Sequence, residues 1–163
     1  MFGVGGAQME WLKISGLQKP NLLIGGSPVT VEARFSWQKD AVESLIISEG
    51  YDNNITLGIA IANHKGSYIF GCNGFDFNLD IDCLKQQQSM VQFDFKLPYL
   101  ASGEYFLTVA IALGRQKHHV QLRWYDCFMQ LKSLETDKNV YGVFAIDYSM
   151  TLVNRTENNV NSE

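Results

Sequence analysis

Large apolar residues stand at every second position in three segments of this chain. The segments span residues 55–62, 90–97 and 104–113, and the positions between the apolar residues hold small or polar ones. Side chains of a β-strand point to opposite faces in turn, so this spacing predicts strands with one face against a core. In 55–62 and 104–113 most of the intervening residues are small, so the outer face of those two strands is expected to be shallow.

Other apolar segments, separated by turns rich in glycine, proline and asparagine, predict further strands. They cover residues 8–17, 29–37, 68–72, 75–81, 122–132 and 141–152. A helical pattern occurs only over 39–47, where β-branched residues and poor caps weaken it. About eight or nine short strands predict an all-β fold, an antiparallel β-sandwich. We expect one domain over residues 1–153 and a polar, disordered tail over 154–163.

Charge and composition exclude several partners. Lys and Arg number 13 and Asp and Glu number 17, a formal net charge of −4, which argues against nucleic acid because phosphate binding draws on clustered Lys and Arg. No run of about eighteen apolar residues could span a membrane. The first residues lack the features of a secretory signal and resemble a cut made inside a longer chain. Cys72, Cys83 and Cys127 have no CxxC spacing and are expected to be buried thiols in a reducing compartment.

Two segments resemble ligand-binding motifs, but the residues that each motif requires are missing at the required positions. The glycine-rich segment 3–6 lacks the Lys-Ser or Lys-Thr of a phosphate loop and the third glycine of a dinucleotide motif, so it predicts a turn into the first strand. Residues 76–82 alternate oxygen-bearing and apolar side chains, but they lack the glycine and glutamate of an EF-hand and predict a strand with a solvated face. We therefore expect no metal and no cofactor.

The sequence singles out no catalytic group. His118 and His119 are adjacent, so in a strand they would point to opposite faces; segment 114–119 predicts a solvated loop tip, with a binding loop as the alternative. No serine lies in a G-x-S-x-G turn, and no spacing selects a pair of carboxylates for glycoside hydrolysis. The residues therefore give no support for an enzyme.

The small faces of two predicted strands suggest a binding surface. If residues 56–62 pair beside residues 108–112, the outer face of their sheet is a shallow trough floored by small side chains. The candidates for binding a glycan there are Tyr68, Phe70 and Trp124 for stacking on sugar C–H faces, and Thr108, Arg123 and Asp126 for hydrogen bonds to hydroxyls. Alternatively, the small residues make room for a subunit or another strand, and the aromatic residues belong to the core. The register decides, because a slip of one residue would turn these side chains inward.

Several short motifs occur along the chain in an order that is typical of one protein family. They are FGVGGA at 2–7, TLGIAI at 56–61 with KG at 65–66 and FGCN at 70–73, FKLPYL at 95–100 with GEYFLTV at 103–109, WYD at 124–126 and YGVF at 141–144. In this order the chain, from about residue 2 to 153, resembles the C-terminal carbohydrate-binding domain of Wzt-type proteins, the ATP-hydrolysing subunits of ABC exporters for bacterial O-antigen polysaccharides. The segment between 126 and 142 fits the family's last strands loosely.

The resemblance implies an immunoglobulin-like β-sandwich that is homodimeric and non-catalytic. By the same resemblance, this module binds the modified non-reducing end of a lipid-linked O-antigen polysaccharide and couples the capped chain to export. The resemblance also implies a separate N-terminal ATPase domain, a transmembrane exporter subunit as the parent protein's partner, and a cytoplasmic position at the inner membrane. The cap in this family can be a methyl or a phosphate-containing group. Candidates for contacting an anionic cap are Arg34, Arg115, Lys117 and Arg123.

Two other functions stay open from the residues. In one, the trough is a contact within a dimer or other assembly, with strand exchange along residues 140–153, and sugar is irrelevant. In the other, the domain is a glycoside-processing enzyme whose acids the spacing does not identify.

Overall fold

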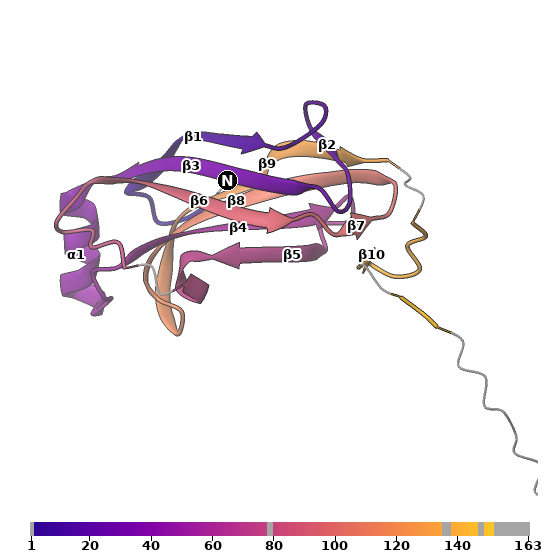
Figure 1. Ribbon diagram of the computed structural model, residues 1–163. Coiled ribbons are helices and arrows are strands. Elements are labelled where there is room, and N and C mark those ends of the chain that lie inside the picture. The colour runs from indigo at the N-terminus through magenta and orange to yellow at the C-terminus, as the bar shows by residue number, and fades with distance from the viewer. Residues whose placement is uncertain (1, 78–79, 135–137, 147–148, 152–163) are drawn as a thin grey trace, which may run out of the picture.

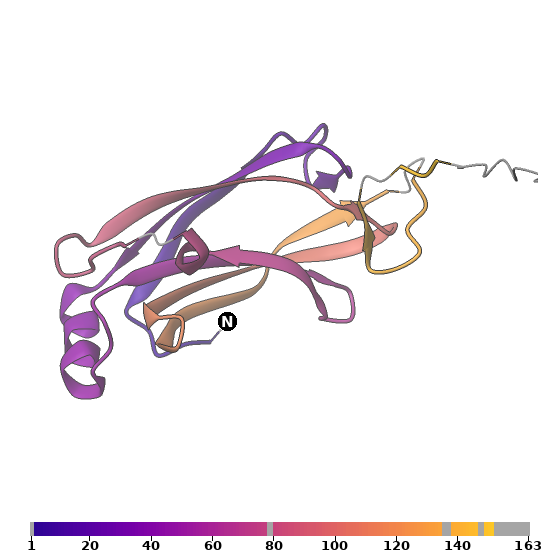
Figure 2. The ribbon, with the colours of Figure 1, turned by 60° about the horizontal axis from the view of Figure 1, so that its bottom comes forward.

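Two β-sheets face each other in the computed structural model of the chain, which describes residues 2–77, 80–134, 138–146 and 149–151 (Figure 1). The larger sheet has the strand order β2-β9-β8-β4-β5, and the smaller one has the order β1-β3-β6. The strands are β1 (Ala7–Ser15), β2 (Leu22–Leu23), β3 (Pro28–Trp37), β4 (Ile55–Asn63), β5 (Tyr68–Asn73), β6 (Gln88–Lys96), β8 (Gly103–Arg115) and β9 (His118–Ser133). Helix α1 (Lys39–Glu49) lies at one end of the sandwich, and a ribbon of β7 (Tyr99–Leu100) with β10 (Phe144–Ala145) lies at the other (Figure 2).

The predicted all-β sandwich is confirmed by these two sheets. Named strands pair antiparallel with one exception among the described residues, β2, which runs parallel to β9. The finer expectation, an immunoglobulin-like topology, stays a prediction.

The period-two pattern decides which side chains form the core. Ile55 and Leu57 of β4 are at most 1% exposed, as are Val109 and Ile111 of β8, and all four belong to the hydrophobic cluster between the sheets. Phe35 of β3 meets them from the smaller sheet with no exposed surface. Burying each such side chain contributes about 1.5–3 kcal/mol, so the alternation fixes the inward face of every long strand.

The weak helical pattern over 39–47 does form a helix, and α1 continues two residues further. Its Val42 is fully buried in the core. Gly50 ends the helix in the left-handed region, with φ at 71°, and its N–H donates to the carbonyl oxygen of Ile46. Burial of one face and this glycine cap therefore outweigh the poor intrinsic propensity.

Two of the predicted strands differ from the structure. Where 75–81 was expected to be a strand, residues 74–77 form a 3-10 turn, η1 (Gly74–Phe77). The Oδ1 of Asn73 accepts from the N–H of Phe75, and the Oδ2 of Asp76 accepts from the N–H of Asn73, so side chains replace the strand ladder. Within 141–152 the described strand is limited to β10, and the expected tail 154–163 lies outside the described residues.

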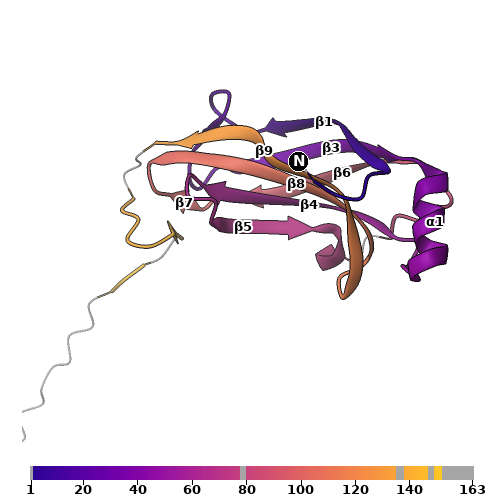
Figure 3. The same cartoon turned by 180° about the vertical axis from the view of Figure 1, so that it is seen from behind.

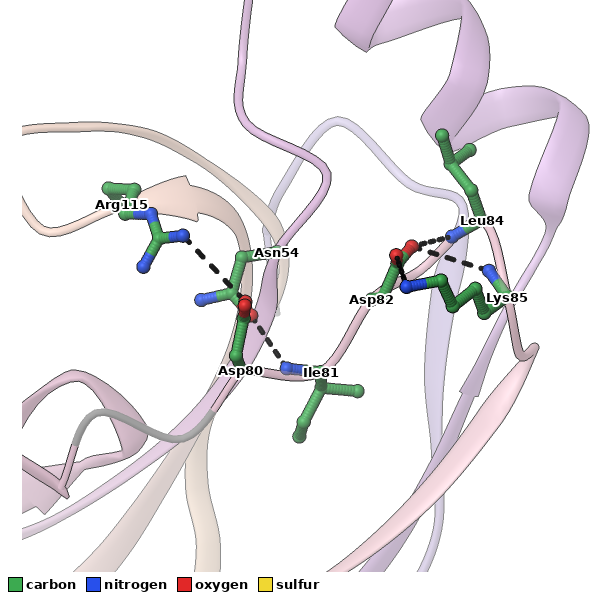
Figure 4. A network of polar contacts seen from close by, with 7 residues as sticks. All are labelled: Asn54, Asp80, Ile81, Asp82, Leu84, Lys85 and Arg115. Carbon is green, nitrogen blue, oxygen red and sulfur yellow. Dashed lines mark hydrogen bonds and ion pairs between the residues drawn. The ribbon is translucent and has the colours of Figure 1, made fainter.

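Side-chain caps also hold the segment that follows η1 (Figure 4). The Oδ1 of Asn54 accepts from the N–H of Ile81 at 2.8 Å, and the Oδ1 of Asp82 accepts from the N–H of Leu84 at 3.0 Å. Lys85 Nζ lies 3.0 Å from Asp82 Oδ2, and this hydrogen bond is the main reason that the pKa of Asp82 is lowered. Asp76 and Asp82 therefore close turns, and the prediction of a solvated strand face over the described residues of this segment is wrong.

The glycine-rich start lies along β9 before it turns into β1 (Figure 3). The N–H of Phe2 donates to the carbonyl of Trp124 at 3.1 Å, and the N–H of Trp124 donates back at 2.7 Å. Gly3 has φ at 129°, and a Cβ there would lie 2.5 Å from the carbonyl oxygen of Leu122. Only glycine fits this approach, so the segment does more than make the predicted turn.

A hydrogen bond between the two sheets gives a stability prediction. The N–H of Met9, at the bulge of β1, donates to the hydroxyl oxygen of Tyr125 on β9 at 2.8 Å. Tyr125→Phe leaves this part-buried N–H without its partner, so we expect the free energy of unfolding to fall by about 1–3 kcal/mol. Denaturant titration measures it. Tyr68→Phe, at a residue 54% exposed, is the control and should change stability by less than about 0.5 kcal/mol; an equal loss in both variants would contradict the account.

Candidate functional site

Small side chains cover the outer face of β4 and β8 and leave a cleft of about 300 Å³, called the trough below. The register brings the two small faces together as the sequence predicts, with Thr56 opposite Ala112, Gly58 opposite Ala110 and Ala60 opposite Thr108. The predicted floor of the trough is therefore confirmed for six residues, Thr56, Gly58, Ala60, Thr108, Ala110 and Ala112. Ala62, which was expected to continue the floor, is buried opposite Phe106 and does not line the cleft.

Strand β5 extends this floor by one more strand. Gly71 pairs with Ala60, and Asn73 pairs with Gly58. A Cβ on Gly71 would lie 2.7 Å from the carbonyl oxygen of Ile59, so this position cannot carry a side chain without moving the sheet. Close backbone approach therefore keeps the floor low on the β5 side.

Aromatic pairs flank the trough at two levels along the strands. Trp124 of β9 meets Tyr68 of β5 edge-on, with 6.4 Å between ring centroids, across the small residues of the two strands between them. On the side of the β8–β9 turn, Phe75 meets His119 at 6.3 Å. Phe2 stacks on Trp124 at 5.3 Å. The hollow thus has a low floor and raised aromatic edges, a shape that suits a flat ligand with apolar C–H faces.

The polar groups of the trough include two buried atoms that lack a partner. Thr56 is 4% exposed, and neither its Oγ1 nor the Oε1 of Gln121 has a hydrogen-bond partner among the described residues. Both residues line the trough. A buried polar atom without a partner costs stability, so it calls for an explanation, and a ligand's hydrogen-bonding group is one.

The predicted binding residues divide between the trough and other places. Thr108 and Trp124 line the trough. Tyr68 lies beside Trp124, and Asp126 accepts a hydrogen bond from Trp124 Nε1 at 3.2 Å. Four of the six candidates therefore gather at or around one edge of the trough.

Phe70 lies on the other face of the sheet, so its expected place in the trough is wrong. A bulge in the pairing puts Ala62 opposite Tyr68 but Ile61 opposite Phe70. The extra residue turns Phe70 inward, where it packs edge-on against Phe95 of the other sheet at 5.8 Å. Simple alternation had put Tyr68 and Phe70 on one face.

Arg123 is displaced from the trough by a second bulge. Ala112 pairs with Gln121 and the preceding Ile111 pairs with Arg123, so Leu122 is the extra residue. Arg123 donates from Nε to the carbonyl of Ala7 at 3.1 Å and lines a separate cleft of about 730 Å³. The expectation that Arg123 serves the trough is therefore wrong, and the same bulge turns Gln121 into the trough instead.

Sequence reasoning did not name Phe2, Phe75 or Gln121 as residues of this region. Phe75 was assigned to a strand, and His119 was covered only by the alternative of a binding loop. His119 is the second residue of β9 and lines the trough, whereas His118, the first residue, stacks on Tyr51 at 4.6 Å. The expected loop tip is thus shorter than predicted, but the opposite orientation of two adjacent strand residues is confirmed.

No group of three or more potential metal ligands occurs in the part of the chain that the structure describes. That part also contains no helix long and apolar enough to cross a membrane. All three cysteines are free, but only Cys83 is fully buried, and Cys72 is half-buried. Cys127 is exposed at a position with φ at 50°, so its predicted burial is wrong.

Comparison with known proteins identifies the family. The family described as the Wzt C-terminal domain matches residues 1–146. The chain belongs to this family. A crystal structure of the C-terminal domain of Wzt has the same fold, with a TM-score of 0.74 and 21% identity over 93% of this chain and 87% of that one. A candidate beta-galactosidase from Bacteroides fragilis is 14% identical over 74% of this chain and 16% of its own, with a TM-score of 0.38, too low to carry an argument. Among curated proteins, none matches.

Membership confirms the resemblance seen in the motifs. Membership of the Wzt family associates this chain in general with O-antigen export by an ABC transporter and with carbohydrate binding. The identity of 21% to the solved structure supports the fold alone, so the binding residues of this chain rest on its own geometry.

The thiols give a prediction about reactivity. Burial, with a smaller contribution from Asp82, raises the pKa of Cys83 to about 11, and burial with Asp76 raises the pKa of Cys72. At pH 8 a pKa of about 11 leaves about one Cys83 in a thousand as thiolate. We expect a thiol reagent to label Cys127 first, Cys72 more slowly, and Cys83 only on unfolding, as peptide mapping would record. Rapid labelling of Cys83 in the folded domain would contradict its burial.

Proposed function

We propose that this Wzt domain is a non-catalytic carbohydrate-binding module whose trough holds the modified non-reducing end of a lipid-linked O-antigen polysaccharide. The observation that carries the proposal is the low floor of β4 and β8 between the Trp124–Tyr68 and Phe75–His119 pairs. Aromatic rings stack on the apolar C–H faces of sugars, and Thr108, Gln116 and Gln121 offer hydrogen bonds to hydroxyls. A cleft of about 300 Å³ matches a chain end of one or two residues rather than a long segment.

The same proposal assigns the domain's place in the exporter. The ATPase of the parent protein supplies the energy, and the transmembrane exporter subunit is the partner through which the domain lies at the cytoplasmic side of the inner membrane. Binding of the finished chain end would then couple synthesis to export, with no cofactor or metal in this domain.

Filling the trough tests the proposal without touching the core. Ala110 is half-buried at the centre of the floor, so Ala110→Phe places a ring in the hollow. The ligand is the O polysaccharide made by the bacterium that encodes this domain. We expect the affinity for it to fall at least tenfold, measured by isothermal titration calorimetry, while the melting temperature stays within a few degrees of that of the unsubstituted domain. Trp124→Ala is the less clean variant, because it also removes the ring on which Phe2 stacks.

Ala101→Phe is the matched control, since it adds the same ring at an exposed turn outside the trough. It should leave affinity unchanged. Equal binding by Ala110→Phe and the parent would move the glycan site elsewhere, and binding of capped and uncapped polysaccharide with equal affinity would remove end recognition from the proposal.

We propose further that the domain is a homodimer through its last described segment. The segment around β10 exposes large apolar side chains: Tyr141 is 88%, Ile146 is 63% and Met150 is 94% exposed. Apolar surface gathered on one extended segment favours a protein contact, and within the described part of the chain β10 pairs only with the two residues of β7. Residues 147–148 and 152–163 lie outside this argument.

Sedimentation equilibrium tests the dimer. At micromolar concentration we expect twice the chain mass, and Ile146→Asp should shift the protein toward monomer because a charge replaces an apolar contact. Ile47→Asp is the control, since Ile47 is 78% exposed on α1 at the other end of the sandwich. If the unsubstituted domain sediments as a monomer, the dimer proposal is wrong. The proposed glycan site does not depend on this result.

A further inference from the structure

The deep side of the trough holds one rung of the sheet with unsatisfied hydrogen bonding. Thr56 of β4, Ala112 of β8 and Gln121 of β9 are direct neighbours in the register. The Thr56 Oγ1 and the Gln121 Oε1 are buried without a partner among the described residues, and Ala112 lies between the two residues in the register. Two strand spacings, about 9.5 Å, separate the backbones of the outer two residues. Ala112 is 3% exposed, so a ligand reaches this rung when neighbouring side chains of the lining shift.

These two orphan atoms have a chemical preference. The Oε1 of Gln121 is an acceptor and needs a donor, which a sugar hydroxyl provides and an ionised phosphate or carboxylate oxygen does not. The Thr56 hydroxyl donates or accepts, so it can bond to a hydroxyl or to an ether oxygen. The methyl group of Ala112 adds an apolar contact for a C–H face or a methyl substituent.

The charges around the trough point the same way. Its described lining residues include no Lys or Arg, and they include the carboxylate of Asp76. Asp76 contributes to the raised pKa of Cys72, which also lines the trough, so its field extends into the hollow. His119 is the third titratable group of the described lining, after Asp76 and Cys72, and its Nδ1 lies 3.2 Å from the carbonyl oxygen of Gln116. An anion would meet Asp76 without a permanently charged cation to offset it.

The cations that could serve an anionic cap lie elsewhere. Arg34, on the opposite sheet, pairs with Glu10 at 2.9 Å. Arg115 pairs with Asp52 at 3.0 Å. It also lies 3.8 Å from Asp80, the contact drawn in Figure 4. Arg123 lines the second cleft, and Lys117 lies outside the trough lining in the β8–β9 turn.

We infer that the trough selects an uncharged glycan terminus, with a hydroxyl-bearing ring placed over Ala112 between Thr56 and Gln121, and that it discriminates against a phosphate-bearing end. This inference rests on the proposed function and adds to it the chemical class of the ligand. Thr56 and Gln121 are then the residues that set specificity, and the cost of leaving their oxygen atoms unpaired is recovered when the sugar binds.

A pair of threonine variants tests the polar contact. Thr56→Val keeps the branched shape and removes the orphan hydroxyl, so we expect binding of the strain's own O polysaccharide to weaken roughly three- to tenfold while the melting temperature stays the same or rises. A merely structural role would lower both. Thr30→Val is the control, because Thr30 lies on the opposite sheet, where its hydroxyl donates to Asp94, and it should leave affinity unchanged.

The salt dependence of the affinity and the Asp76→Asn variant test whether the bound glycan terminus is charged. The asparagine keeps an oxygen that can accept from the N–H of Asn73, as Asp76 does at 3.2 Å. For an uncharged terminus, affinity should stay within about twofold between about 50 and 500 mM NaCl, and within about twofold in Asp76→Asn. Polysaccharide treated with phosphatase should bind as well as the untreated polymer.

The outcomes distinguish a failure of the uncharged-terminus inference from a failure of the proposed glycan binding. Binding that weakens severalfold in high salt, tightens severalfold in Asp76→Asn, or is lost after phosphatase treatment would overturn the uncharged terminus and leave glycan binding intact. Unchanged affinity in Thr56→Val would overturn the contact at Thr56. No binding of any form of the polysaccharide by the parent chain would overturn the proposed function and this inference together.

Discussion

Strands β4 and β8 have large apolar side chains on one face and small side chains on the other, and the structure depends on both faces. Their inward positions hold large aliphatic side chains, such as Leu57 and Ile111, which are at most 1% exposed and lock the larger sheet onto the smaller one. Their outward positions hold glycine, alanine and threonine, which leave the sheet surface hollow. Because successive side chains of a strand alternate between faces, one register creates the core and the floor of the trough together. The floor of the trough therefore depends on the same strand pairing as the core behind it.

Bulges then decide what surrounds that floor. One extra residue in β5 places Tyr68 outside and Phe70 inside, and one in β9 exchanges Arg123 for Gln121 at the trough. A bulge changes the face of every residue beyond it, so it can aim a polar side chain at a ligand without altering the strand order. The result is a hollow with amide, hydroxyl and aromatic groups and one carboxylate, and an arginine kept in a different cleft.

This separation of surfaces suits a module that has several partners at once. The trough lies on the outer face of the larger sheet, and the exposed apolar residues follow β7 and β10 at the end opposite α1 (Figure 1). A glycan end and a second protein chain could thus be bound without competition. Unpaired polar atoms such as the Thr56 hydroxyl reduce stability in the free domain, and proteins commonly retain such violations where a ligand satisfies them.

The sequence by itself determined the all-β class, the inward and outward faces of β4 and β8, and the family, because period-two alternation is a local property that every strand residue reports. It also predicted Thr108 and Trp124 as trough residues. Tertiary structure alone decided the places of Phe70, Arg123 and Gln121, since each depends on a bulge set by the neighbouring strand. It likewise turned 74–77 into η1 through the caps of Asn73 and Asp76, although the residues alternate as in a strand. The physical reason is that alternation fixes a face only while the pairing stays in register, and the pairing partner lies far away in the sequence.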